Sequence, residues 1–351
     1  MAKNLLEEGG VTMGLKRNGL VGVLVLVVAM IFLTSACYAG DLPKIKLKVA
    51  QAMMPKESLT HKLIVEMCQN VTKRTGGKVT WRIFGPEIGD WTELQRMTMK
   101  GAVDMQFNAW DTSLDQRWNA AYLPFLVSTW AEARKVYAPN GLFDKLGNKW
   151  AAKVGLYYMG TWLNNLGSLG LKGKPIITPE EAKGVKIRCP PMDIFKCYVE
   201  KMGFTTVTIP WAETPTAIST GVADGWVGSG AVYMYNLFRD VAKTMVVTYD
   251  FGEMWSVSFC LKKWKKLPEQ YKKIIQEETN KTILKHLNLV EAEEMEYQEK
   301  LRRHGWTVVN MAKDHPKELE VWRTRARQCW DLYTPVLGEK AMNELKRMVG
   351  M

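Results

Sequence analysis

Short segments in which every second residue is apolar alternate along this chain with longer segments whose apolar residues recur every three or four positions. The first pattern is typical of half-buried strands and the second of amphipathic helices. In the first third of the chain, strands are predicted at 45–50, 78–84 and 103–108, and helices at 59–74 and 92–100. This β-α-β-α-β order predicts a doubly wound α/β lobe.

The middle of the chain repeats this order. Strands are predicted at 155–160, 185–189, 205–209 and 222–227, and helices at 194–202 and 214–221. Thr178 and Glu181 have the spacing of a capping box, which predicts a short helix that ends at Gly184. These elements predict a second α/β lobe.

The last third is mainly helical. A strand at 256–261 precedes one long helix at 268–303, whose polar face carries Lys and Glu. A strand at 306–310 and helices at 316–333 and 339–349 complete the chain. With 351 residues the chain is too long for one ordinary core, and a long helix placed after two lobes is suited to brace them.

The N-terminus has the pattern of a secretory signal peptide. Lys16 and Arg17 precede an apolar run, Leu20–Leu33, and small residues follow it. The run has about 14 residues, short of the roughly 20 that a membrane anchor needs, so we expect residues 1–39 to be cleaved off after Ala39. Lipidation at Cys37 is an alternative, and Met13 is an alternative start. Both cleavage after Ala39 and lipidation at Cys37 would place the mature chain outside the cytoplasmic membrane.

The formal net charge is +12, which raises the question of nucleic-acid binding. The basic residues are spread along amphipathic helices and alternate there with Glu, and no nucleic-acid motif is present. We therefore expect no nucleic-acid partner; the charge also suits an acidic small ligand or an anionic membrane face.

Five cysteines remain after the predicted cleavage, without C-x-x-C spacing. This argues against a disulfide framework or a zinc site and favours small buried residues. The histidines at 61, 286, 304 and 315 form no metal-binding motif, and the sequence contains no nucleophile elbow, phosphate loop or dinucleotide fingerprint. We expect no cofactor, no metal site and no enzyme activity, with catalysis as the alternative that product analysis would test.

Four segments, in this order and spacing, resemble the solute-binding proteins of tripartite (TRAP) transporters: 73–79, 122–126, 179–188 and 221–226. The similarity extends over about residues 47–337. It implies an α/β, two-lobed periplasmic clamp with crossing strands and a long bracing helix, which delivers a small organic acid to membrane permease subunits. The lobes are expected at 41–163 plus 254–303, and at 164–253 plus 304–351 with the C-terminal helices. A binding protein of another importer or of a sensor system is the alternative.

The resemblance also implies that Arg188 binds the ligand carboxylate, because a guanidinium offers a planar donor fork that fits a carboxylate. From the residues alone, an ordinary surface salt bridge is the favoured interpretation. The further candidates for ligand binding are Trp211, Trp226, Trp110, Asn164, Glu93 and Glu253. Core packing is the alternative for each Trp, and a favourable position at a helix N-terminus is the alternative for Glu93.

Two departures bear on the ligand. Sialic-acid-binding relatives carry a further Arg in the segment that matches residues 166–168, and an Asn where this chain has Gly228. The sequence therefore predicts a flatter, more apolar site that is suited to a small or aromatic monocarboxylate.

Overall fold

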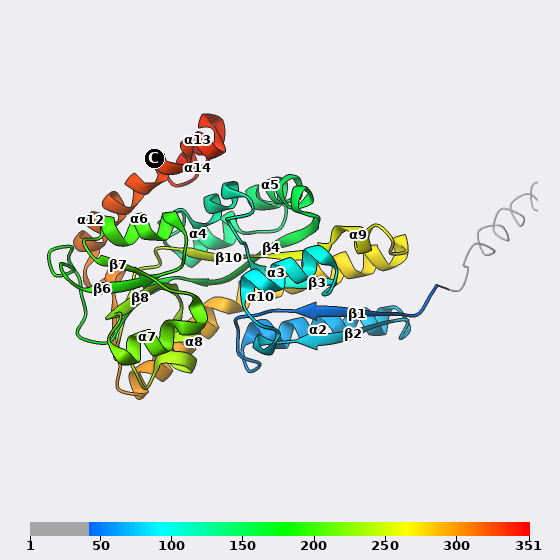
Figure 1. Cartoon of the computed structure of the whole chain (residues 1–351), viewed down its shortest axis with the longest axis horizontal. Helices are drawn as coiled ribbons and strands as arrows, with labels where there is room; N and C mark the ends of the chain where they lie inside the picture. Colours follow the sequence, from blue (N-terminus) through cyan, green and yellow to red (C-terminus); the bar gives the residue numbers. More distant parts are fainter. Residues whose placement is uncertain (1–41) are drawn as a thin grey trace, which may run out of the picture. The chain divides into compact units, whose positions relative to one another are not determined.

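Figure 1 shows a computed structural model in which residues 42–351 are described. The first of two sheets has the strand order β2-β1-β3-β10-β4. Its strands are β1 (Ile45–Ala50), β2 (Val79–Phe84), β3 (Met105–Ala109), β4 (Leu156–Leu166) and β10 (Gly252–Cys260). Strand β1 pairs in parallel with β2 and β3, whereas β10 is antiparallel to both β3 and β4.

The second sheet has the order β11-β9-β5-β8-β6-β7. Its strands are β5 (Ser168–Leu171), β6 (Lys186–Cys189), β7 (Thr205–Thr208), β8 (Gly225–Ser229), β9 (Thr244–Val247) and β11 (Thr307–Asn310). Strands β6, β7 and β8 are parallel neighbours, so their carboxyl ends meet at one edge of the sheet.

The chain crosses between the sheets at Gly167 and again at residues 248–251, and the Gly167 amide donates to the Phe251 carbonyl (2.6 Å). A Cβ on Gly167 would lie 3.1 Å from the Gly228 Cα, so the two backbones can approach this closely only without side chains. The crossing strands expected from the resemblance are therefore present.

Helices cover both sheets (Figure 1). They are α2 (Leu59–Arg74), α3 (Trp91–Lys100), α4 (Trp130–Val136), α5 (Leu142–Ala151), α6 (Asp193–Lys201), α7 (Thr214–Thr220), α8 (Ala231–Tyr233), α9 (Leu261–Trp264), α10 (Glu269–Arg303), α11 (Met311–Asp314), α12 (Pro316–Arg327), α13 (Thr334–Leu337) and α14 (Glu339–Met348). Helix α10 packs against α2 and β4 of the first sheet and against α8 and β11 of the second. This confirms the predicted bracing helix.

Two helix predictions are wrong. Residues 178–184 form a turn and not a helix, although the Glu181 carboxylate accepts the Ile177 and Thr178 amides (2.8 and 3.2 Å) as in a capping box. Gly184 adopts φ +82°, which ends the helical path after about one turn. The predicted helix 316–333 ends at Arg327, and a 3-10 segment, η6 (Gln328–Tyr333), follows it.

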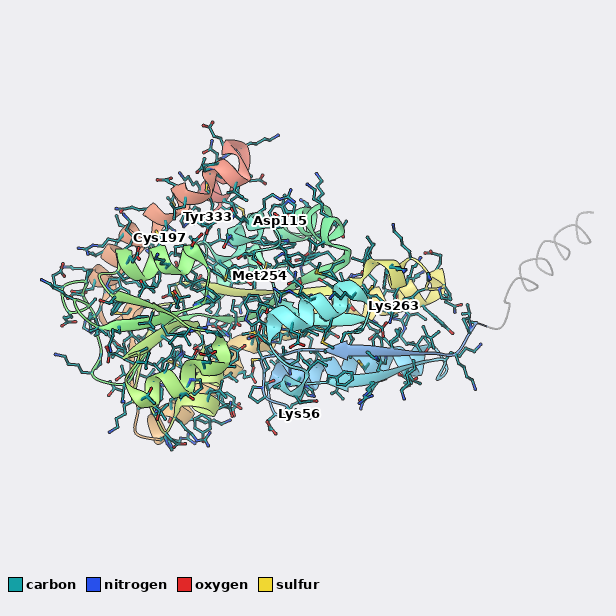
Figure 2. All side chains as sticks on the ribbon, in the orientation of Figure 1. Lys56, Asp115, Cys197, Met254, Lys263 and Tyr333 are labelled. Carbon is teal, nitrogen blue, oxygen red and sulfur yellow. A yellow bond between two sulfur atoms is a disulfide. The ribbon has the colours of Figure 1, made fainter. Side chains whose placement is uncertain are left out.

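The cysteine prediction needs a correction. Cys197 of α6 and Cys329 of η6 form a disulfide across a sequence separation of 132, whereas Cys68, Cys189 and Cys260 are free and buried as expected. Figure 2 shows Cys197 beside the C-terminal segment. The pairing depends on the packing of α6 against η6, which leaves no local spacing signal.

The predicted leader, residues 1–39, lies outside the described residues. Within residues 42–351, no helix combines the length and the apolar character that crossing a bilayer requires. The lobe boundaries given above stay a prediction.

Candidate functional site

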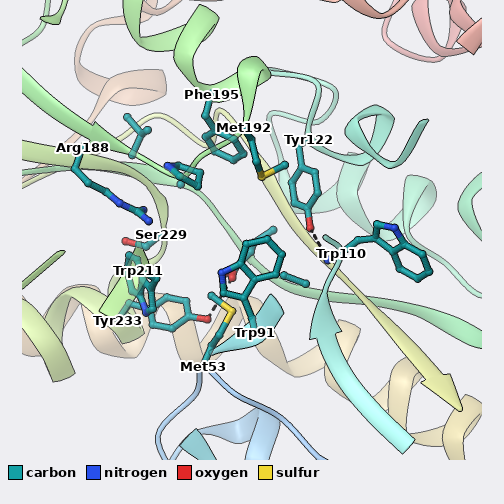
Figure 3. A pocket seen from close by; sticks show the side chains of 15 residues that line it. Met53, Trp91, Trp110, Tyr122, Arg188, Met192, Phe195, Trp211, Ser229 and Tyr233 are labelled. Carbon is teal, nitrogen blue, oxygen red and sulfur yellow. Dashed lines mark hydrogen bonds between the residues drawn. The ribbon is translucent and has the colours of Figure 1, made fainter. Parts of the chain in front are cut away.

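A cavity lies where the carboxyl ends of β1 and β3 face those of β6 and β8 (Figure 3). It holds about 550 Å³ of space free of protein atoms, including the part open to solvent. The first sheet and its connections contribute Met53, Trp91, Ala109, Trp110, Tyr122 and Glu253, and the second contributes Arg188, Pro190, Met192, Phe195, Trp211, Val227, Gly228, Ser229 and Tyr233. Open α/β sheets bind ligands at this edge.

Arg188 is the third residue of β6 and is only 3% exposed. Its Nε donates to the Ile209 carbonyl (2.9 Å), and the guanidinium carbon lies 5.3 Å from the ring centre of Trp211. Figure 3 shows the guanidinium directed towards Ser229 and Trp211, into the cavity. Among residues 42–351, no carboxylate forms an ion pair with it.

Burial lowers the pKa of Arg188 to about 10, because the charged form loses hydration without gaining a counter-ion. The group stays protonated at neutral pH. It is therefore a buried cation that lacks an anionic partner within residues 42–351.

The cavity wall is largely aromatic and apolar. Trp211, in a short 3-10 turn after β7, packs edge-on against Tyr233 at 5.2 Å. Phe195 of α6 lies 6.0 Å from the Tyr122 ring and stacks on Phe251 at 4.2 Å. Such rings provide stiff apolar surface on which a ligand body can pack.

Glu253 is the acidic group of the cavity. Its Oε1 accepts from the Tyr233 hydroxyl (3.2 Å) and the Trp255 indole (3.0 Å), and its Oε2 accepts from the amides of Asn164 (3.0 Å) and Asn165. Burial raises its pKa to about 7, and the four donors act in the opposite direction. Glu253 is consequently poised to change its charge near neutral pH.

Asn164 connects this carboxylate to the long helix. Its carbonyl oxygen accepts from the Thr60 hydroxyl (3.1 Å), which also contacts the His286 ring of α10 (3.2 Å). His286 is buried against Trp162, and burial lowers its pKa to about 3. A buried hydrogen-bond chain thus runs from the cavity floor to α2 and α10.

The structure brings four of the seven predicted residues to the cavity: Arg188, Trp211, Trp110 and Glu253. Asn164 lies behind Glu253 and does not line the cavity. Trp226 stacks on Phe238 at 3.9 Å in the core and donates its indole N–H to Ser229 Oγ (2.8 Å), so it supports the wall from beneath.

Glu93 is exposed in the first turn of α3 and does not line the cavity. This placement matches the helix-terminus alternative.

Sequence reasoning missed other wall residues: Met53, Trp91, Tyr122, Met192, Phe195, Ser229 and Tyr233. Tyr122 belongs to one of the segments that carried the family resemblance, which was a usable signal. Tyr233 had none, because it reaches the cavity from α8 only through tertiary packing.

A model of the family described as bacterial extracellular solute-binding protein, family 7, matches residues 50–335. The chain belongs to this family. The C4-dicarboxylate-binding protein DctB of Bacillus subtilis is 22% identical over 284 residues, 78% of each chain. The family comprises transport proteins, in agreement with the prediction that the chain is not an enzyme.

Solved structures of TRAP periplasmic solute-binding proteins share the fold. The protein from Desulfovibrio salexigens with bound orotic acid is 20% identical, has a TM-score of 0.77 and covers 87% of this chain and 97% of its own. The protein from Sulfurospirillum deleyianum with bound succinate is 17% identical, has a TM-score of 0.79 and covers 88% of this chain and 100% of its own. The predicted TRAP resemblance and the two-lobed α/β clamp are confirmed, and the solute-binding protein acts outside the cytoplasm.

Proposed function

We propose that this solute-binding protein captures a small monocarboxylate with an apolar or aromatic body, and that Arg188 binds the carboxylate. The observation that carries the proposal is the buried guanidinium of Arg188, which lacks an anionic partner among the described residues. An unpaired buried charge is costly, and an entering carboxylate removes that cost while forming charge-assisted hydrogen bonds.

The rest of the cavity favours one negative charge on the ligand. Arg188 is the cationic side chain of the wall, and Glu253 would repel a second carboxylate. Aromatic and Met side chains make up most of the remaining surface, and these suit an apolar body more than a polyhydroxylated one. The carboxylates bound by relatives agree with an acid ligand.

We also propose that binding closes the clamp. Wall residues come from both sheets, so a ligand that touches Arg188 on one side and Trp91 or Tyr122 on the other stabilises the closed arrangement. Membrane permease subunits of a TRAP transporter would receive the ligand from that closed form.

Calorimetric titration of the purified chain with a panel of organic acids, chosen by thermal-shift screening, tests the proposal. We expect Arg188→Ala to weaken binding at least about tenfold, equivalent to about 1.4 kcal/mol. Arg347→Ala on exposed α14 is the matched control and should bind as the parent does. Unchanged affinity in Arg188→Ala, or binding restricted to polyhydroxylated sugar acids, would contradict the proposal.

A further inference from the structure

We propose that the end of the first sheet that lies farthest from the cavity binds the anionic phospholipid surface of the membrane. The carboxyl ends of β1 and β3 and the start of β10 reach the cavity. The opposite end of this sheet therefore contains the starts of β1, β2, β3 and β4 and the end of β10, because β10 runs antiparallel to its two neighbours.

Hydrogen bonds hold the connecting segments at this end side by side. The Ile45 amide donates to the Lys78 carbonyl (2.8 Å), and the Cys260 amide donates to the Asp104 carbonyl (2.8 Å). The Leu261 amide donates to the Gly155 carbonyl (2.9 Å). Because β3 also pairs with β1, and β10 pairs with β3 and β4, segments from five separate parts of the sequence lie at one end of the sheet.

This end of the sheet is rich in lysine, and we call it the basic end. It carries the exposed side chains of Lys44, Lys46, Lys100, Lys153, Lys262, Lys265 and Lys266. None of these seven forms an ion pair with a carboxylate of the described chain; the nearby pairs involve other lysines, Lys263 with buried Asp104 and Lys272 with Glu269. Figure 2 shows Lys263, a residue of α9, at this end. The positive charge of the seven is consequently open to solvent.

A lipid bilayer fits this distribution of charge. The lysines are spread over the ends of four strands, β1, β3, β4 and β10, and are not gathered in one pocket, and lipid headgroups likewise present charge over a plane. Each Lys or Arg near an anionic bilayer adds to the attraction, and the attraction decays within a Debye length.

The covalent order of the chain supports the same partner. Ten residues separate Lys44 from the apolar run that ends at Leu33. Ten residues span at most about 35 Å, so the membrane lies within that reach of the basic end until the expected cleavage after Ala39, and permanently with the alternative lipid anchor at Cys37. In this orientation the cavity, at the far end of the sheet, faces away from the lipid.

Vesicle sedimentation tests the inference, using the chain from Gly40 onwards, whose residues Lys44–Met351 form one compact unit. We expect the chain to sediment with vesicles of phosphatidylglycerol and phosphatidylcholine, to stay in solution with phosphatidylcholine alone, and to be released by added salt. The triple variant Lys262→Glu, Lys265→Glu, Lys266→Glu should lose at least about tenfold in partitioning.

A triple variant with the same change in net charge is the control: Lys313→Glu, Lys317→Glu, Lys340→Glu, at exposed positions on α11, α12 and α14. It should keep partitioning within about threefold of the parent. Equal losses of vesicle partitioning in both variants would assign the effect to net charge and overturn the inference. A parent chain that does not bind vesicles containing phosphatidylglycerol would also overturn it. If the variant of Lys262, Lys265 and Lys266 keeps its partitioning to vesicles and only its solute uptake falls, an acidic protein partner takes the place of lipid.

Calorimetry on the same variants separates this inference from the proposed ligand site. Both triple variants should keep the ligand affinity of the parent, since neither change lies at the cavity. Failure of Arg188 to bind a carboxylate would leave the vesicle result unaffected.

Discussion

Replacing Arg188 by Met should separate its role in binding from its role in stability. Burial lowers the pKa of Arg188 to about 10, and this shift corresponds to a cost of about 3 kcal/mol for the charged form in the ligand-free protein. Met fills similar space without a charge. The substitution loses the hydrogen bond to the Ile209 carbonyl, about 1 kcal/mol, and the contact over Trp211, about another 1 kcal/mol.

The relieved burial cost exceeds the two lost contacts by about 1 kcal/mol. We therefore expect the ligand-free Arg188→Met variant to be about 1 kcal/mol more stable than the parent and no longer to be stabilised by the ligand. Urea unfolding measures the first quantity, and the ligand-induced rise in melting temperature measures the second. A ligand-free variant that is less stable by about 2 kcal/mol or more would refute the reasoning, because it would mean that the guanidinium is already satisfied within the fold.

Two further predictions concern the disulfide and the acidic group of the cavity. Cys197→Ser with Cys329→Ser should lower the free energy of unfolding by up to about 5 kcal/mol, from the entropy of a loop that spans a sequence separation of 132; reductant should destabilise the parent and leave the double variant unchanged. Ligand affinity should fall as the pH rises through about 7, because a bound carboxylate favours protonated Glu253 and repels the ionised form. Calorimetry at about pH 6 and pH 8 checks this, and Glu253→Gln should flatten the dependence; a parent affinity that rises with pH would reverse the assigned sign.

The sequence predicted the elements whose signals are local. Helix α2 begins and ends as expected, because Ser58 caps it and a Gly pair follows it. Strand β4 was predicted to stop at Gly160 but runs to Leu166, since its pairing with β10 extends it. Pairing of distant strands is not visible in a periodicity.

The residues of the site likewise fall into those with a local sequence signal and those whose position depends on tertiary packing. Arg188 lies at the end of a short strand in a segment with a family pattern, and the structure directs it into the cavity. Trp211 and Trp226 gave equal signals, yet one lines the cavity and the other is buried beneath it, because their neighbours in space decide their exposure. The disulfide was missed for a related reason, since its two cysteines meet only after α6 and η6 have packed together.

The sequence separation of 132 between Cys197 and Cys329 sets an order of events during maturation. The bond between these two cysteines needs oxidising surroundings, which the cytoplasm does not provide. The chain up to and including Cys329 must therefore cross the membrane before the disulfide can form. The disulfide fixes helix α6, which carries Phe195, only after export. The wall of the cavity is therefore completed outside the reducing cytoplasm.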